Sequence, residues 1–168
     1  MNSMRNIKLG KVTLNIGAGT NTAKLDKGIK LIHHIAGRKP VKTFTTKRIP
    51  TWGVRPGLPL GCKLTLRKKP AREVLTRLLQ AKENKLSSKQ FDDLGNVAFG
   101  IHEYIDIPGA KYDPDVGIMG LEVCVTLERA GFRIKKRRTR KSTIPKTHTI
   151  KREEAIDYLK KEFGVVVN

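Results

Sequence analysis

Apolar and polar residues alternate with a period of two in three segments of the chain, and this pattern predicts half-buried β-strands. The three segments are 11–16, 61–67 and 121–127. Two further strands are predicted for 40–45 and 97–107. In the first two segments the polar positions, which we expect to face away from the core, are Lys11, Thr13, Asn15, Lys63, Thr65 and Arg67.

Apolar residues recur at helical spacing in three other segments, which predicts three amphipathic helices. The first begins with a cap at Asn21 or Thr22 and ends at Gly37. The second has Pro70 at its first position, and the third begins after a cap at Thr149 and ends at Gly164. The residues expected to be buried are Leu25, Ile29, Ile32 and Ala36, then Ala71, Val74, Leu75, Leu78 and Leu79, and finally Ala155, Ile156, Leu159 and Phe163.

The mixed order of these elements indicates an α+β fold, a two-layer sandwich of a mainly antiparallel sheet with helices on one face. We expect residues 1–130 to form the core domain. Residues 131–168 are expected to add a basic arm or hairpin and a C-terminal helix packed on the same domain, with 165–167 as a short edge strand. The other face of the sheet is expected to be open, polar and basic, which suits the minor groove and backbone of RNA.

The chain carries a net charge of +20, from 35 Lys and Arg against 15 Asp and Glu. Such an excess destabilises a compact state by self-repulsion, so it indicates a polyanionic partner, with nucleic acid ahead of an anionic membrane surface. The charge is also segregated, because no acidic residue occurs in 27–72 or in 133–146. The basic block consists of Arg133, Lys135, Lys136, Arg137, Arg138, Arg140, Lys141 and Lys146.

A long turn-rich loop is predicted for 46–59, where prolines and glycines alternate with cations. Loops of this length in compact domains are usually functional or mobile. The residues of interest in this loop are Lys47, Arg48, Arg55 and the single tryptophan, Trp52.

Candidate catalytic chemistry is weak throughout the sequence. The run Gly17-Ala18-Gly19 lacks the third glycine of a dinucleotide-binding turn, and the adjacent His33 and His34 are not at metal-binding spacing. Cys62 and Cys124 are interpreted as reduced packing residues, Phe99 as a core residue, and Tyr104 and Phe132 as either core residues or stacking platforms. We expect no catalytic site, metal or cofactor, and the absence of a long apolar run or a signal-like N-terminus predicts a cytoplasmic protein with no membrane contact.

Several strings resemble the universal family of large-subunit ribosomal protein number five, in its archaeal form. They are KVTLNIGAG (11–19), GRKPVKTFTTKRIPTWGVRPGLPLGCKLTLR (37–67), FDDLGNVAFGIHEYIDIP (91–108) and KYDPDVGIMGLEVCVTL (111–127). The resemblance covers most of residues 4–127, and the tail from 131 to 168 resembles the archaeal and eukaryotic ending.

The resemblance implies a structural protein that binds 5S rRNA in the central protuberance, largely through its sheet and nearby loops. It implies further contacts with large-subunit rRNA, a neighbouring 5S rRNA-binding protein, a small-subunit head protein at an intersubunit bridge, and peptidyl-site tRNA through the loop 46–57. By motif match, the RNA-contacting residues of the family fall on Asn15 and Thr65. A third contact is a Gln in the family, and Arg38 stands in its place here.

Together, the pattern and the resemblance predict docking by shape and electrostatics. The cations neutralise phosphates, while Asn15 and Thr65, with Thr13, Arg38, Lys63 and Arg67 around them, fix the register. Two alternatives stay open from the residues alone: a chromatin-type protein that compacts any nucleic acid, and an RNA-modifying enzyme.

Overall fold

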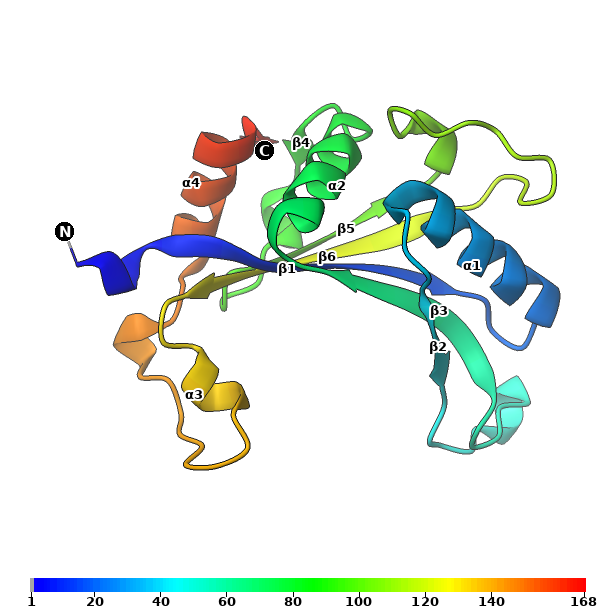
Figure 1. Cartoon of the computed structure of the whole chain (residues 1–168), viewed down its shortest axis with the longest axis horizontal. Coiled ribbons are helices and arrows are strands. Elements are labelled where there is room, and N and C mark those ends of the chain that lie inside the picture. Colours follow the sequence, from blue (N-terminus) through cyan, green and yellow to red (C-terminus); the bar gives the residue numbers. More distant parts are fainter. Residues whose placement is uncertain (1) are drawn as a thin grey trace.

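The computed structural model describes residues 2–168, and its centre is a five-stranded sheet with the order β2-β3-β1-β6-β5 (Figure 1). Every pair of neighbouring strands is antiparallel. The strands are β1 (Ile7–Gly17), β2 (Val41–Phe44), β3 (Pro59–Leu66), β5 (Asn96–Ile101) and β6 (Leu121–Arg129).

Three helices cover one face of this sheet: α1 (Thr22–Ala36), α2 (Lys68–Gln80) and α4 (Arg152–Phe163) (Figure 1). The opposite face carries no helix layer, although the short helix α3 (Arg133–Lys136) and the loop between β2 and β3 both extend on that side (Figure 1). This arrangement confirms the predicted α+β sandwich with helices on one face of an antiparallel sheet.

The core lies between the sheet and the helices, and the apolar residues of the alternating strands fill it as predicted. Val12, Leu14 and Ile16 of β1 are buried there, and all five predicted residues of α2 join them. On α1 the buried face is rotated from the expected one, because Leu31 and Ile35 are buried while the predicted Ile29 and Ala36 are only partly covered. The rotation brings Gly28 onto the sheet, where an added Cβ would lie 3.2 Å from a methyl carbon of Ile16.

Helix boundaries follow capping chemistry that the pattern only partly located. Asn21 caps α1, since its side-chain oxygen accepts from the amide of Lys24, and Gly37 ends that helix in a left-handed conformation. Helix α2 begins at Lys68 rather than at Pro70. Pro70 is still tolerated there, because the first-turn N–H groups of a helix have no acceptor within it.

The strand predicted for 97–107 ends at Ile101, so the prediction was too long. The chain folds back and forms a single 3-10 turn at Tyr104–Asp106. Tyr104 and Ile107 are buried by this return, and the Tyr104 hydroxyl accepts from the amide of Asp113 at 2.8 Å. The apolar residues here are therefore core residues, but not strand residues.

The C-terminal part departs most from the expectation. Residues 131–148, called the arm below, form no hairpin, because α3 is followed by irregular chain. Thr149 does not cap α4: its hydroxyl donates to the carbonyl of Lys146, and Glu154 instead accepts from the amide of Lys151. The last strand, β7 (Val166–Val167), pairs in parallel with β4 (Lys85–Leu86) and so lies outside the main sheet.

Candidate RNA-binding surface

The strand register sets the order of side chains across the open face of the sheet. Residues directly opposite each other on neighbouring antiparallel strands project from the same face. Asn15 therefore lies between Lys63 of β3 and Glu122 of β6. In the next row Thr13 lies between Thr65 and Cys124. The register thus brings Thr13, Asn15, Lys63 and Thr65 together, as the alternation predicted.

The open face is polar, and its positive charge is smaller than the alternation of β1 and β3 indicated. Lys8, Lys11 and Lys63 face it, but Glu122 and Glu128 of β6, directly beside β1, offset part of their charge. The expectation considered the outward residues of β1 and β3 only. The alternation in 121–127 did mark Glu122 as outward-facing, yet only the strand order places that strand beside β1.

Glu122 also contacts the predicted RNA-binding residue Asn15 directly. The side-chain amide of Asn15 donates to a carboxylate oxygen of Glu122 at 3.1 Å. This bond fixes which end of the Asn15 side chain faces β6. The Asn15 carbonyl oxygen is left to accept a hydrogen bond, for example from a ribose hydroxyl.

The two cysteines differ in position. Cys62 is fully buried in the core, as expected, and burial raises the pKa of its thiol. Cys124 is also a free thiol, but it is only partly buried and lies on the open face, so the expectation that it is a buried packing residue was wrong. Desolvation, followed by the nearby charge of Glu122, raises the pKa of the Cys124 thiol and keeps it protonated at neutral pH.

The first of two basic projections is the loop of residues 45–58, between β2 and β3 (Figure 1). Its backbone is ordered by a bridge between Ile49 and Val54, and Val54 is buried. The cations that the sequence predicted here, Lys47, Arg48 and Arg55, are all exposed, and none has a salt bridge within residues 2–168. Trp52 at the loop tip is 71% exposed.

The second projection is the arm, which carries a dense cluster of cations. Lys136 pairs with Glu128 of the sheet, and the Arg137 side chain donates to the carbonyl of Arg140 at 2.7 Å. The remaining predicted contacts are exposed and form no salt bridge within the described chain; they are Arg133, Lys135, Arg138, Arg140 and Lys141.

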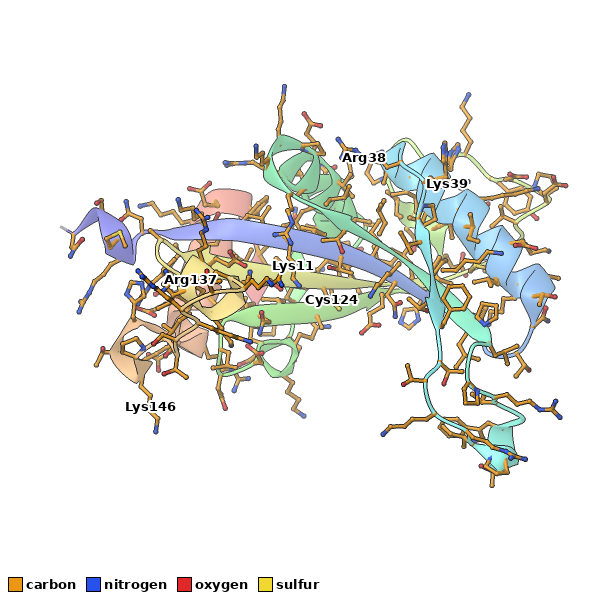
Figure 2. All side chains as sticks on the ribbon, turned by 60° about the horizontal axis from the view of Figure 1, so that its bottom comes forward. Lys11, Arg38, Lys39, Cys124, Arg137 and Lys146 are labelled. Atoms are coloured by element: carbon orange, nitrogen blue, oxygen red, sulfur yellow. The ribbon has the colours of Figure 1, made fainter. Side chains whose placement is uncertain are left out.

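Two predicted residues lie at the margin of this surface. Arg38 is exposed in the connection between α1 and β2, and Figure 2 shows it with Lys39 at the α1 end of the molecule, well apart from Arg137 and Lys146. Arg67 is exposed where β3 ends and α2 begins.

The aromatic candidates differ in burial, and Phe99 lies in the core as predicted. Phe99 and Tyr104 are buried in the core, so neither is a stacking platform. Phe132 is partly buried and packs edge-on against His148, with ring centroids 5.8 Å apart. Trp52, at 71% exposure, is more exposed than Phe44 at 61% and Tyr112 at 57%.

Comparison with known proteins agrees with this arrangement. Residues 2–55 match the family model described as ribosomal protein L5, and residues 59–158 match the model that describes the C-terminus of the same ribosomal family. The chain belongs to the ribosomal protein L5 family. The family consists of structural proteins of the large ribosomal subunit, which confirms the expectation of a non-enzymatic function.

Archaeal members of the family are similar over nearly their whole length. A protein named large ribosomal subunit protein uL5 from Sulfurisphaera tokodaii is 45% identical, covering 99% of this chain and 95% of the relative. The proteins of the same name from Nanoarchaeum equitans and Methanosphaera stadtmanae are 47% and 42% identical, covering 98% and 99% of this chain and 97% and 99% of theirs. No helix within residues 2–168 has the length and apolar content that crossing a bilayer requires.

Proposed function

We propose that this protein binds 5S rRNA in the central protuberance of the large subunit, with the RNA seated on the open face of the sheet. The observation that carries the proposal is the arch formed by the open face, the loop of residues 45–58 and the arm (Figure 1). A polar sheet that carries both lysines and glutamates lies between two projections that carry free cations. This shape fits a polyanion that is recognised on its sugar and base edges and held by its phosphates.

The sheet and the projections have different tasks in this proposal. Asn15 and Thr65, with Thr13 and Lys63 in the same rows, make directed hydrogen bonds that fix the register of the RNA. Arg38 and Arg67 contact the backbone at the margin, and the cations of the arm neutralise further phosphates of 5S and large-subunit rRNA.

The loop of residues 45–58 is proposed to contact peptidyl-site tRNA. Its free cations Lys47, Arg48 and Arg55 bind phosphates reversibly, and the exposed ring of Trp52 is available to a base or sugar. We further propose contacts with a neighbouring 5S rRNA-binding protein and with a small-subunit head protein at an intersubunit bridge, both of which the family resemblance implies.

A competition titration tests the main proposal. Labelled 5S rRNA is bound to the protein at physiological salt and challenged with tRNA, duplex RNA and duplex DNA. The expected result is a preference of about 100-fold or more for 5S rRNA, whereas a binder driven by phosphates alone discriminates little. Asn15→Ala and Thr65→Ala should each lower the 5S rRNA affinity by roughly 0.5–1.5 kcal/mol, the net value of one hydrogen bond.

The matched control is Thr76→Ala, an exposed threonine of α2 on the helical side of the sheet, which should leave the preference unchanged. Equal competition by all polyanions would instead favour a general nucleic-acid-compacting protein. Turnover of RNA with a methyl donor would favour the RNA-modifying enzyme.

A second experiment tests the tRNA contact. A triple Ala variant at Lys47, Arg48 and Arg55 is compared with a triple Ala variant at Lys24, Lys160 and Lys161, three exposed lysines of α1 and α4. Only the loop variant should speed release of peptidyl-site tRNA from assembled ribosomes. Equal release rates in the two variants would remove the tRNA contact from the proposal.

A further inference from the structure

A groove of about 1000 Å³ runs between the arm and the open face of the sheet. Its floor includes Lys11, Thr126 and Asn96, which stand opposite one another on β1, β6 and β5. This row is separated from Asn15 and its neighbours by the row that contains Thr13. The groove is therefore at a different place on the face from the proposed 5S rRNA register site.

The lining of the groove combines free positive charge with apolar surface. Lys11, Lys135 and Lys141 contribute cations to it, and none of the three has a salt bridge within residues 2–168. Leu94, which is 57% exposed, and Ile144, which is partly exposed, supply apolar walls from the sheet side and the arm side. In Figure 2, Lys11 and Cys124 lie on the face over which the arm that carries Arg137 folds.

This combination selects among possible occupants. A duplex hides the faces of its bases in the stack, so it offers the groove phosphates but nothing for its apolar walls. An unpaired nucleotide presents both a phosphate for the lysines and a flat base for the apolar side chains. The hydroxyl of Thr126 and the free side-chain carbonyl of Asn96, whose amide group donates to Asp92 at 2.6 Å, are available to a ribose or base edge.

We propose that the groove binds a few unpaired nucleotides of ribosomal RNA, with their phosphates on Lys11, Lys135 and Lys141 and a base against Leu94 and Ile144. The inference rests on the proposed role in RNA binding and adds to it a second, single-strand site. A helix docked on the sheet and a single strand held under the arm together fix the RNA at two points.

The test is a fluorescence anisotropy titration of the full chain with a short single-stranded oligoribonucleotide and, separately, with duplex RNA. A variant with both Lys135→Ala and Lys141→Ala should lose single-strand affinity by roughly 20-fold at 0.1 M salt. Each phosphate contact to a single strand adds about 0.7 to the slope of log affinity against log salt, so two lost contacts over the one decade between 1 M and 0.1 M salt give this factor. The charge-matched control changes Lys160 and Lys161 to Ala on the opposite side of the molecule and should have a much smaller effect.

Leu94→Ser separates the apolar contribution from charge. It should weaken the single strand several-fold and leave duplex RNA unchanged, while Ile118→Ser, at an exposed apolar residue away from the groove, changes neither. Equal loss of both RNA forms, no loss at all, or displacement of the oligonucleotide by an acidic peptide at similar concentration would overturn the inference.

The outcomes also separate this inference from the proposed function. If Leu94→Ser has no effect while Asn15→Ala still lowers the preference for 5S rRNA, the groove assignment fails and the proposed function stands. If the protein shows no preference for 5S rRNA while Leu94→Ser selectively weakens binding of the single strand, the groove assignment stands and the proposed function fails. A photoreactive residue in place of Ile144 in assembled subunits identifies whether 5S or large-subunit rRNA supplies the nucleotides, and crosslinking to protein alone would contradict both sources.

Discussion

The arm and α4 are joined to the end of the sheet by the side chain of Arg129. This residue is 7% exposed, and its guanidinium donates to a carboxylate oxygen of Glu154 at 2.6 Å. It also donates to the carbonyls of His148 and Thr149, each at 3.4 Å. The other Glu154 oxygen accepts from the amide of Lys151 at 2.9 Å. One ion pair thus connects the last residue of β6, the end of the arm and the first turn of α4.

Replacing Glu154 by Ala is expected to destabilise the fold by about 1–2 kcal/mol. Breaking a fully buried pair costs about 3–5 kcal/mol, because the remaining charge is left without a partner. The Glu154 side chain is 41% exposed, so solvent screens part of that loss. The effect should still exceed that of a surface pair, because Arg129 stays buried and its Nε already has no partner among residues 2–168.

Urea unfolding measures the stability, and limited trypsin digestion reports how firmly the arm is held. The matched control is Glu162→Ala on the same helix, which breaks an exposed pair with Arg72 and should cost at most about 0.5 kcal/mol. Glu154→Ala should also speed cleavage in the arm, whereas Glu162→Ala should not. Equal costs for the two variants, with unchanged cleavage, would refute the role assigned to Arg129.

Three other changes have defined outcomes. Gly61→Ala would place a Cβ 2.6 Å from a backbone oxygen of β1 and should lower stability by about 1–3 kcal/mol in thermal unfolding, whereas Gly17→Ala, with open space around it, should change it by about 0.5 kcal/mol or less. Glu122→Ala should raise affinity for all RNA by removing a negative charge but reduce the preference for 5S rRNA by releasing Asn15, and Glu122→Gln, which still accepts that hydrogen bond, should restore the preference in the competition titration. Burial alone would raise the pKa of Glu154, but hydrogen bonds and charges from Lys151 and Arg129 outweigh burial and lower that pKa. The stability that Glu154 contributes in urea unfolding is therefore present above the ordinary pKa of a glutamate and is lost as the pH falls through the lowered pKa. This pH-dependent contribution should vanish in Glu154→Gln.

Local patterns predicted the elements whose signal lies within their own sequence. The alternation of Val12, Leu14 and Ile16 requires only that one face of a strand be buried, and the five apolar residues of α2 require only one apolar helical stripe. Both signals lie within a single element, so no knowledge of the tertiary arrangement was needed. The same reasoning placed Asn15 and Thr65 on the outward face of their strands.

The errors occur where a distant partner decides the structure. Nothing near Glu122 in the sequence indicates that β6 pairs with β1, so the contribution of Glu122 and Glu128 to the charge of the open face was missed. The strand that begins at Asn96 ends at Ile101, and beyond it the buried Tyr104 hydroxyl accepts from the distant amide of Asp113. The start of α4 is set by Glu154, whose position depends on Arg129, rather than by the local capping preference of Thr149.

The glutamates of the open face have a consequence for how affinity and selectivity arise. Phosphate contacts supply affinity that falls with salt but carry little sequence information. In this molecule the loop of residues 45–58 and the arm carry clusters of cations without salt bridges, while on the sheet between them Glu122 and Glu128 offset part of the positive charge. A strongly basic sheet would hold any RNA in any register, since attraction to phosphate is not directional. A sheet whose cations are partly offset by acids leaves more of the register to the hydrogen bonds of Asn15 and its neighbours, so selectivity survives even though the whole chain carries a charge of +20.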